Sequence, residues 1–420
     1  MTDVLEELTW RGLIAHCTDL DDLRAHLGSG PVSYYVGFDP TAPSLHMGNL
    51  VQLIVAGHLQ RAGHRPVILV GGSTGLIGDP KQTGERVLND PDVVAGWVRR
   101  IQAQVARYLD VDGENAATVV NNLDWTGPLS TIEFLRDVGK HFPVNRMLAR
   151  DVVRTRLDSG ISYTEFSYVL LQSLDYRELF RRHGVTLQFG GSDQWGNITA
   201  GVELIRRSEG ERVHALATPL LTKADGTKFG KTESGTVWLD PELTSPYAFH
   251  QFFLNAEDAK VVEYLKVFTG RSREEIEELA ELTEREPHRR AAQKALADDI
   301  TAFVHSERER DEAVDAAGAL FGRTELGELS ESALAGAMRE VGAVPLRGDE
   351  LPTVAEAMEL AGVVPSRSAA RRAIAEGGAY VNNQKVTDPE ARLSEGDLLH
   401  RRWVVLRRGR RTVGAVSRAS

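Results

Sequence analysis

The sequence has one cysteine, Cys17, among its 420 residues. A single thiol cannot form a disulfide within the chain, and it cannot build a zinc cluster of cysteines and histidines. Chains without structural disulfides are typical of a reducing compartment. We therefore expect a cytoplasmic protein with no metal site of the Cys/His kind.

Long apolar runs are also missing. No stretch approaches the roughly 18 apolar residues that a membrane-spanning helix needs, so we expect no membrane association. The first residues, Met1–Glu7, are acidic and lack the apolar core of a secretory signal. A hydrophobic content of 42% with 26% charged residues is ordinary for a globular protein, and the length predicts two or three domains.

An excess of positive charge over the whole chain is absent, because the formal net charge is −11. This argues against a protein that coats nucleic acid over its entire surface. The charge is uneven, however. Residues 352–420 hold 12 Lys and Arg against 7 Asp and Glu, a net of +5, whereas the rest of the chain carries −16. A basic end on an acidic body predicts a local contact with nucleic acid.

The elements that are present predict an α/β fold. Strand candidates at 32–38, 66–70, 117–121 and 186–189 alternate with helical segments such as 48–61. This alternation predicts a Rossmann-like parallel sheet with helices on both faces. Ligands of such sheets bind at the carboxyl ends of the strands, and that is where the glycine pairs of this chain fall.

The second half of the chain has a different amino-acid composition. Residues 249–321 are rich in Ala, Glu, Lys and Arg with helical spacing, and the end of the chain combines a helix with basic strands. We expect a Rossmann-like domain, a helical domain, a linker and a small basic α+β domain. Their expected bounds are 1–247, 248–325, 326–350 and 351–420, respectively.

The first chemical motif is the loop 39–49, in which two prolines precede His46, Gly48 and Asn49. We expect a helix to begin here, and helix N-termini offer N–H groups and a positive dipole to phosphates. The alternative is a helix N-cap with an incidental surface histidine. The tetrapeptide alone does not decide between the two.

The second motif is Lys228–Thr232, which places two lysines three residues apart around a glycine. A phosphate-binding P-loop would need glycine at position 225, where the chain has aspartate, so that spacing fails. The remaining interpretations are a mobile loop whose lysines neutralise a triphosphate and a solvated lysine-rich loop.

Together the two motifs resemble the signature pair of class I aminoacyl-tRNA synthetases. Asn49 departs from that family, in which histidine is the commonest residue at this position. The chain is further similar to bacterial-type tyrosyl-tRNA synthetases, and the similarity covers essentially the whole length. Its five ordered segments are Tyr34–Thr41, Val70–Pro80, Tyr163–Tyr168 followed by Gln172 and Asp175, Phe189–Asn197, and Lys223–Gly235.

The resemblance implies a tyrosine site. Tyr35 and Asp175 would hold the substrate phenol, and Gln194 would lie near its carboxylate. The amino group would be bound by Asp79, Tyr168 and Gln172. Tyr168, Gln172 and Asp175 are four and three residues apart, which places them on one helix face. The alternatives are a core role for Tyr35 and a turn or helix cap for Asp79.

The resemblance also implies an ATP site and catalytic residues. Magnesium would accompany ATP, and no tightly bound cofactor is expected. Asp193 would bind a ribose hydroxyl, and Gly191 would allow close approach of the adenosine. The implied ATP-binding residues are Gly37, Asp39, His46, Gly48, Asn49, Gly191, Asp193 and Lys231. The implied catalytic residues are Thr41, His46, Arg86, Lys228 and Lys231, with Lys81 as a further candidate.

The implied activity is that of a tyrosine–tRNA ligase, with L-tyrosine, ATP and tRNA(Tyr) as substrates and a homodimer as the usual assembly. The basic end, from Ser366 to Asn383, resembles the small RNA-binding domain named after ribosomal protein S-four. Its candidate RNA contacts are Arg367, Arg371 and Arg372, for which a solvated basic face is the alternative. Two further hypotheses are a tryptophanyl-tRNA synthetase and a non-catalytic RNA-binding relative of the same fold.

Overall fold

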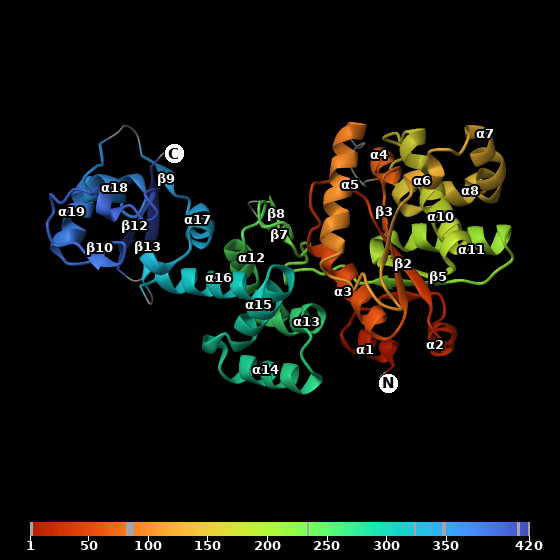
Figure 1. Cartoon of the computed structure of the whole chain (residues 1–420), viewed down its shortest axis with the longest axis horizontal. Helices are drawn as coiled ribbons and strands as arrows, with labels where there is room; N and C mark the ends of the chain where they lie inside the picture. The colour runs from red at the N-terminus through yellow and green to blue at the C-terminus, as the bar shows by residue number, and fades with distance from the viewer. Residues whose placement is uncertain are drawn as a thin grey trace. The chain divides into compact units, whose positions relative to one another are not determined.

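The computed structural model describes residues 3–80, 88–232, 235–322, 325–346, 350–409 and 412–418. The chain forms two compact units, shown in Figure 1. Unit 1 comprises Met1–Leu239 and Ala259–Glu278, and unit 2 comprises Asp240–Asp258 and Leu279–Ser420. Within the described residues, no helix is both long and apolar enough to cross a bilayer.

Unit 1 is built on a six-stranded sheet in the order β1-β6-β5-β2-β3-β4. All neighbouring strands are parallel except β1, which runs antiparallel to β6. The strands are β1 (His16–Cys17), β2 (Ser33–Phe38), β3 (Arg65–Val70), β4 (Thr118–Asn121), β5 (Val185–Gly191) and β6 (His214–Thr218). The chain runs from β2 outward to β3 and β4 on one side, and returns to β5 on the other side of β2. The neighbours β2 and β5 therefore flank the switch point where such sheets bind ligands.

Helices cover both sides of this sheet, as Figure 1 shows, with α3 and α5 on one side and α10 and α11 on the other. Helix α10 begins after Ser162, whose side chain caps Glu165, and ends at Gly184 with a φ of 62°. The longer helices are α1 (Val4–Trp10), α2 (Leu20–Gly28), α3 (Met47–Arg61), α5 (Pro91–Val105), α10 (Tyr163–His183) and α11 (Trp195–Ser208). The shorter ones are α4 (Thr74–Ile77), α6 (Leu123–Thr126), α7 (Thr131–Glu133), α8 (Val144–Leu148) and α9 (Asp151–Arg154).

The predicted α/β class and its parallel sheet are confirmed, and the four predicted strands correspond to β2, β3, β4 and β5. The strands β1 and β6 were not predicted. The two-residue β1 is too short for an alternating pattern. The β6 sequence His-Ala-Leu-Ala-Thr is buried at every position, so it lacks the alternation of apolar and polar residues that marks a half-buried strand.

Part of the expected helical segment packs in unit 1. This part is α13 (Asp258–Phe268), which belongs to unit 1 from Ala259 onward and leads into α14 (Arg273–Arg285). The buried Arg11 guanidinium of α1 donates to the carbonyls of Lys266, Thr269 and Arg271, at distances of 2.7, 2.7 and 3.0 Å. These bonds satisfy carbonyls at and beyond the C-terminus of α13, and they attach this helix to the end of α1 in unit 1.

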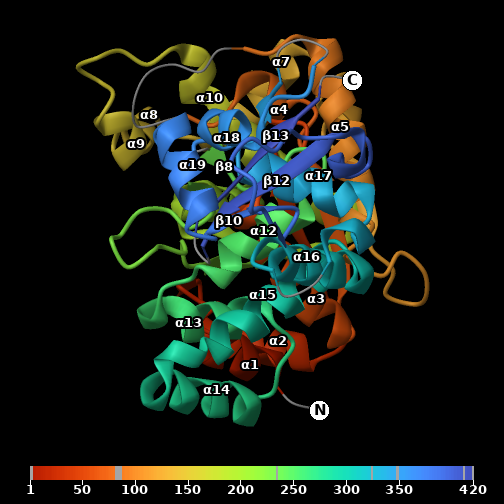
Figure 2. The same cartoon turned by 90° about the vertical axis from the view of Figure 1, so that its left-hand side faces the viewer.

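Unit 2 combines helices with a five-stranded sheet in the order β11-β10-β12-β13-β9. Besides the end of α14, the helices before the basic end of the chain are α12 (Pro246–Leu254), α15 (Ala291–Val304), α16 (Glu307–Leu320) and α17 (Glu331–Glu340). The strands are β9 (Val344–Pro345), β10 (Ala379–Val381), β11 (Gln384–Lys385), β12 (Trp403–Arg408) and β13 (Thr412–Ser417). Figure 2 shows α18 (Val354–Leu360) and α19 (Arg367–Ala375) beside β10, β12 and β13.

The helices and the basic sheet of unit 2 share a hydrophobic core. Leu320 and Leu334 of the helices pack in one cluster with Trp403 and Val405 of β12. The segment 326–350, which we expected to be a linker, contributes α17 to this cluster. Ala333, Leu334, Gly336, Ala337 and Met338 make up the apolar part of α17, and all five are buried. The turn residues on either side of α17 are easy to recognise in the sequence, whereas its amphipathic pattern is short. This is why the sequence predicted a linker here.

Candidate active site

A cavity of about 720 Å³ lies at the carboxyl ends of β2 and β5. It brings together residues from segments as far apart as Tyr35 and Lys231. The site residues predicted from the sequence that line it are Tyr35, Gly37, Asp39, Thr41, His46, Gly48, Asn49, Asp79, Tyr168, Gln172, Asp175, Gly191, Asp193, Gln194, Lys228 and Lys231. Arg86 and Lys81 lie outside the described residues.

One end of the cavity is closed by Tyr35 of β2 and Asp175 of α10, both of which are at most 1% exposed. Asp175 accepts a hydrogen bond from the Trp125 indole N–H at 2.8 Å on Oδ1, and one from Asn122 Nδ2 at 3.0 Å on Oδ2. Burial raises the pKa of Asp175 to about 7, against the lowering effect of these two bonds. The bonds fix the carboxylate at the cavity wall.

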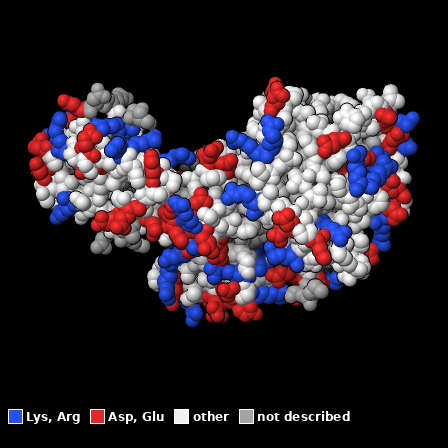
Figure 3. Space-filling model, viewed as in Figure 1, with Lys and Arg blue, Asp and Glu red and all other residues white. Residues whose placement is uncertain are grey.

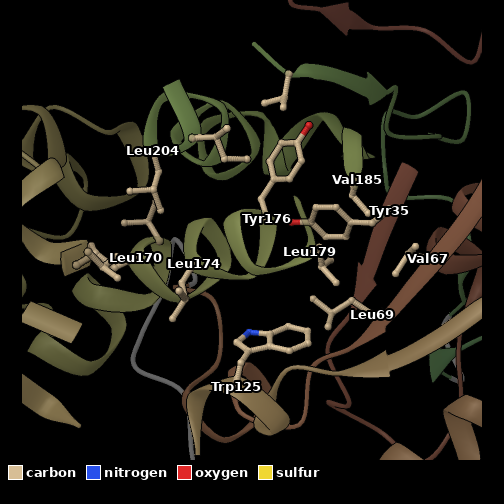
Figure 4. Close-up of a cluster of buried hydrophobic side chains, with 14 of the residues drawn as sticks. Tyr35, Val67, Leu69, Trp125, Leu170, Leu174, Tyr176, Leu179, Val185 and Leu204 are labelled. Carbon is tan, nitrogen blue, oxygen red and sulfur yellow. The ribbon is translucent and has the colours of Figure 1, made fainter. Parts of the chain in front are cut away.

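The Tyr35 hydroxyl is buried and has no hydrogen-bond partner among the residues that the structure describes. Figure 4 shows the Tyr35 side chain with its hydroxyl pointing toward α10 and the ring of Tyr176. The two rings lie 5.3 Å apart at an angle of 60°. Burial holds the pKa of Tyr35 well above its usual value, so the hydroxyl keeps its proton and can both donate and accept.

Asp39 connects two parts of the cavity lining, Tyr168 of α10 and Thr74 of α4. Its carboxylate accepts a bond from the Tyr168 hydroxyl at 2.6 Å and another from Thr74 Oγ1, also at 2.6 Å. Asn122 Nδ2 donates to the same threonine oxygen at 3.0 Å. At Gly71 a Cβ atom would lie 2.2 Å from Asp39 Oδ1. Glycine is therefore required there for the carboxylate to reach its partners.

The middle of the cavity offers acceptors for a cation. Asp79 accepts from Gln194 Nε2 at 2.8 Å and from Asn197 Nδ2 at 3.1 Å. Asn197 is in turn bonded by Arg150. Gln172 Oε1 is buried and has no partner among the described residues. An ammonium group has three donors, and Asp79 with Gln172 presents carboxylate and carbonyl oxygens to it.

The opposite end of the cavity is formed by the start of α3. His46 is its N-cap, with Nδ1 accepting from the Gly48 N–H at 3.1 Å, and Asn49 Oδ1 accepts from the His46 N–H at 3.0 Å. Burial lowers the pKa of His46, and the charges of Lys231 and Lys228 lower it further. A neutral His46 with Nδ1 as acceptor carries its proton on Nε2, where it serves as a donor. His46 is therefore the helix N-cap, but it is not an incidental surface residue, because it lines the cavity and keeps one donor for a ligand.

The lysine loop lies against this helix start. Gly230 has a φ of 87°, and a Cβ atom on it would lie 2.7 Å from Met47 Cβ. Phe229 packs on Tyr264 of α13 with 4.1 Å between ring centroids, and Tyr264 donates to the Thr222 carbonyl at 2.9 Å. Lys231 begins β7 (Lys231–Thr232), which pairs with β8 (Gly235–Thr236). The lysine side chains are exposed and line the cavity beside His46.

Several residues of the site were not predicted from the sequence. Asn122 and Trp125 hold Asp175, Thr74 holds Asp39, and Gln52 and Gln188 line the cavity. The only available signal was the polar pair at 121–122 directly after a strand, because strand ends of this kind carry ligand-binding residues. The glutamines belong to a buried helix and a buried strand that carry no motif.

The three candidate RNA-binding arginines lie at the start and middle of α19 in unit 2. Arg367 pairs with Glu356 at 2.8 Å and with Glu359 at 3.1 Å, and Arg371 pairs with Glu390 at 3.1 Å. Figure 3 shows Lys and Arg interspersed with Asp and Glu on this part of the surface. The arginine-rich face is therefore partly neutralised by its own carboxylates.

Known proteins match this chain over its whole length. Residues 28–322 match the family of class I tRNA synthetases (W and Y), and residues 334–414 match the tyrosine–tRNA ligase SYY-like C-terminal domain. The tyrosine–tRNA ligase of Cutibacterium acnes is 63% identical over 418 residues, which is 100% of both chains. This chain belongs to the tyrosine–tRNA ligase family.

Solved structures agree with this family. A C-terminally truncated mitochondrial tyrosyl-tRNA synthetase of Coccidioides posadasii is 31% identical, with a TM-score of 0.66 over 75% of this chain and 92% of that one. Its counterpart from Aspergillus nidulans is 30% identical, with a TM-score of 0.68 over 76% of this chain and 95% of that one. Each similarity covers at least 75% of this chain.

Proposed function

We propose that this protein joins tyrosine to tRNA(Tyr) in two steps. The carboxylate of L-tyrosine attacks the α-phosphorus of ATP, which forms tyrosyl-adenylate and releases pyrophosphate. The tyrosyl group then passes to the 3′-terminal ribose of the tRNA. The observation that carries this proposal is the buried hydroxyl of Tyr35 beside Asp175, which has no hydrogen-bond partner among the described residues. It lies at one end of a cavity whose other end holds His46 and two lysines.

The phenol end explains the choice of amino acid. A substrate phenol has one donor and accepts as well, and its O–H would donate a hydrogen bond to Asp175 while its oxygen accepts one from the Tyr35 hydroxyl. Phenylalanine in the same place would leave the buried Tyr35 hydroxyl without that partner and would take one donor away from Asp175, which keeps its bonds to Trp125 and Asn122. An unsatisfied buried polar group costs about 1–3 kcal/mol, and more when the group is charged. The site therefore selects for the hydroxyl as well as for the ring.

The next part of the cavity binds the backbone of the amino acid. Asp79 and Gln172 supply acceptors to its ammonium group, together with the hydroxyl oxygen of Tyr168. Gln194 is held by Asp79 at 2.8 Å and lies near the carboxylate. This arrangement orients the carboxylate toward the nucleotide end.

The chemical step needs no general base, because the tyrosine carboxylate is already a nucleophile. Catalysis then consists of positioning and of stabilising the charge that develops on the leaving pyrophosphate. The groups that do this are Thr41, the Nε2–H of His46, and the ammonium groups of Lys228 and Lys231, with Arg86 as a further candidate. Magnesium accompanies ATP on its phosphates.

The nucleotide lies along the ends of β2 and β5 and the start of α3, each of which contains a glycine. Gly37, Gly48 and Gly191 allow its close approach, and Asp193 accepts from a ribose hydroxyl. The Asp39 carboxylate is engaged by Tyr168 and Thr74, so we assign it to positioning the site beside the nucleotide. Asn49 uses its carbonyl in the helix cap, and its amide group remains as a donor for phosphate.

A direct test is aminoacylation with radioactive tyrosine. We expect tyrosine to become acid-precipitable only when both ATP and tRNA are present. Periodate-oxidised tRNA, which lacks an intact terminal ribose, should accept nothing. Equal incorporation on oxidised tRNA would contradict the proposed second step, and incorporation of tryptophan in place of tyrosine would favour the tryptophanyl alternative.

We assign tRNA binding to the basic residues of 351–420, with the helical segment 248–325 on the anticodon side and adenylate formation in 1–247. Replacing Arg371 and Arg372 by glutamine should lower kcat/KM for tRNA charging about tenfold and reduce its salt dependence, because phosphate contacts release counterions. Pyrophosphate exchange should not change. The matched control replaces the exposed neighbours Arg99 and Arg100 of α5 by glutamine, because they lie outside the two segments assigned to the tRNA and outside the cavity lining. The same loss in that variant would refute the assignment.

We also propose a homodimer in the cytoplasm. Exposed apolar side chains gather in one stretch of unit 1, where Ile132, Val144 and Tyr163 are 71%, 61% and 67% exposed. Such a stretch fits a second copy of the chain, because exposed apolar groups of this size mark interaction surfaces. Sedimentation equilibrium should give the mass of two chains, and the mass of one chain would exclude the dimer.

A further inference from the structure

Strand β12 is buried on both of its faces. Successive side chains of a strand point to opposite sides of its sheet. Val404 and Leu406 pack with α18 and α19 in the hydrophobic core of the basic end, 351–420. Trp403 and Val405, which alternate with them, pack with α12, α16 and α17 in the second cluster of unit 2. The basic end therefore shares a core with the helices that precede it.

This second cluster joins segments that match two different families. Helices α12 and α16 lie within residues 28–322, and β12 lies within residues 334–414. Moving the basic end away from α16 would uncover the indole of Trp403, which is only 5% exposed, and the cost of exposing apolar surface opposes such a movement. Apolar burial is not directional, however, so it does not fix the angle between the sheet and the helices.

Two polar side chains supply the missing direction. Asn383 Nδ2, in the turn after β10, donates to the Ala319 carbonyl near the end of α16 at 2.6 Å. His400 Nε2, in the turn before β12, donates to the Leu329 carbonyl between α16 and α17 at 2.9 Å. Hydrogen bonds depend on angle as well as on distance. Two such bonds from separate turns define one orientation of the sheet on the helices.

The turns themselves do not need these side chains. Asn383 has a φ of 65° and His400 has a φ of 46°, a left-handed conformation that glycine adopts without steric cost. Residues other than glycine are uncommon in this conformation. Each side chain adds to its turn a donor that glycine lacks, and each donor is bonded to a carbonyl of the preceding helical segment.

We propose that Asn383 and His400 are positioning residues for the tRNA. They hold 351–420 in one orientation on the helices, so that Arg371 and Arg372 of α19 are presented to the RNA from a fixed position. The inference rests on the proposed function, because it takes tRNA as the ligand of these arginines. If the basic end were docked in only a fraction of the molecules, the apparent affinity for tRNA would be reduced by that fraction.

The first test measures the orientation in the absence of tRNA. Asn383→Gly/His400→Gly keeps both turns and removes both bonds. Spin labels at Arg308→Cys of α16 and Glu376→Cys beside α19, both exposed positions, report their separation by double electron–electron resonance, with Cys17→Ser to remove the native thiol. We expect one narrow distance distribution when Asn383 and His400 are present, and a distribution about twofold broader in the double variant. Equal widths would overturn the inference.

The second test measures tRNA charging by the same double variant without labels. Its KM for tRNA should rise about five- to tenfold, whereas tyrosine-dependent pyrophosphate exchange should not change. The slope of log KM against log salt concentration should equal that of wild type, because neither side chain contacts a phosphate. A smaller slope, as expected for Arg371→Gln/Arg372→Gln, would make Asn383 and His400 direct RNA contacts and would contradict their positioning role.

Asn382→Gly is the matched control, because it makes the same substitution in the same turn, at a residue whose φ is 46°. Asn382 Nδ2 donates to the Asp397 carbonyl and its Oδ1 accepts from the Val405 N–H, so these bonds lie within the basic end. This variant should lower the Tm, keep the narrow distance distribution and leave the KM for tRNA unchanged. A distribution as broad as that of the double variant would show that the turn as a whole, and not Asn383, sets the orientation.

The outcomes separate the two proposals. If the wild type charges no tRNA, the proposed function is wrong, and the width of the distance distribution still decides whether Asn383 and His400 fix the orientation. If the wild type charges tRNA and the double variant has a broad distribution with an unchanged KM for tRNA, the function stands and the positioning role is wrong.

Discussion

Asp175→Asn should lower kcat/KM for tyrosine in adenylate formation by about 1,000-fold. The substitution keeps the size of the side chain but removes the charged acceptor for the substrate phenol. It also places an NH₂ group opposite one of the two donors, Trp125 Nε1 or Asn122 Nδ2, that now bond the carboxylate. A lost charged hydrogen bond and a buried unsatisfied donor together account for about 3–5 kcal/mol.

The loss should be specific for the phenol. For phenylalanine the activity of Asp175→Asn should change little, so the preference for tyrosine over phenylalanine should largely disappear. Asp124→Asn is the control, because it makes the same change of charge at an exposed aspartate close to Asn122 and Trp125 in the sequence. This variant should behave as wild type. If Asp175→Asn kept its preference for tyrosine, Asp175 would not bind the phenol.

The same residue predicts a pH dependence of stability. Burial raises the pKa of Asp175 to about 7 from 3.8, so between these values the folded protein holds a proton that the unfolded chain has lost. Stability from this group is present at low pH and is lost as the pH rises through 7. Between pH 5 and pH 8 the unfolding free energy of wild type should fall by ~3 kcal/mol relative to Asp175→Asn. Urea unfolding of both proteins at the two pH values measures this change. If the difference in unfolding free energy between wild type and Asp175→Asn were the same at pH 5 and pH 8, the raised pKa of Asp175 would be wrong.

Lys231→Ala should reduce the maximal rate of adenylate formation by about 100- to 1,000-fold. The ammonium group reaches the cavity from the hairpin of β7 and β8 and faces the end that His46 forms. There it stabilises negative charge that appears on the departing pyrophosphate. Tyrosine binding, measured by equilibrium dialysis without ATP, should be unchanged because the phenol and ammonium sites lie at the other end.

A lysine that precedes this loop provides the control for this prediction. Lys223 is not among the residues that line the cavity, and Lys223→Ala should retain the wild-type rate. Equal losses in Lys223→Ala and Lys231→Ala would show that the loop contributes only general positive charge. In that case Lys231 would have no specific role in stabilising the charge on the departing pyrophosphate.

Much of the catalytic fold could be predicted because its strands are bounded by clear signals. Strands β2, β3 and β5 end in glycines or in a proline-rich loop, and helices follow with regular spacing. The two strands at the other edge, β1 and β6, lack these signals. The packing of α13 could not be foreseen, because it depends on Arg11 and on Phe229, residues far from it in sequence.

The site residues were predictable where their spacing in the sequence places them on one face of a helix. Tyr168, Gln172 and Asp175 do fall on the face of α10 that lines the cavity. The supporting residues were not predictable, because Trp125 and Asn122 act through bonds to Asp175 that only the fold brings together. Gln52 stands in a run of apolar residues, where its spacing suggests no ligand.

The most direct test of the account is pyrophosphate exchange in the absence of tRNA. Labelled pyrophosphate enters ATP only if an enzyme-bound adenylate forms reversibly. We predict exchange that depends on tyrosine, with phenylalanine and tryptophan supporting it at least 1,000-fold less efficiently at equal concentration. Exchange driven equally well by phenylalanine or tryptophan, or no exchange with tyrosine in a folded sample, would contradict the assignment of Tyr35 and Asp175 as a tyrosine site.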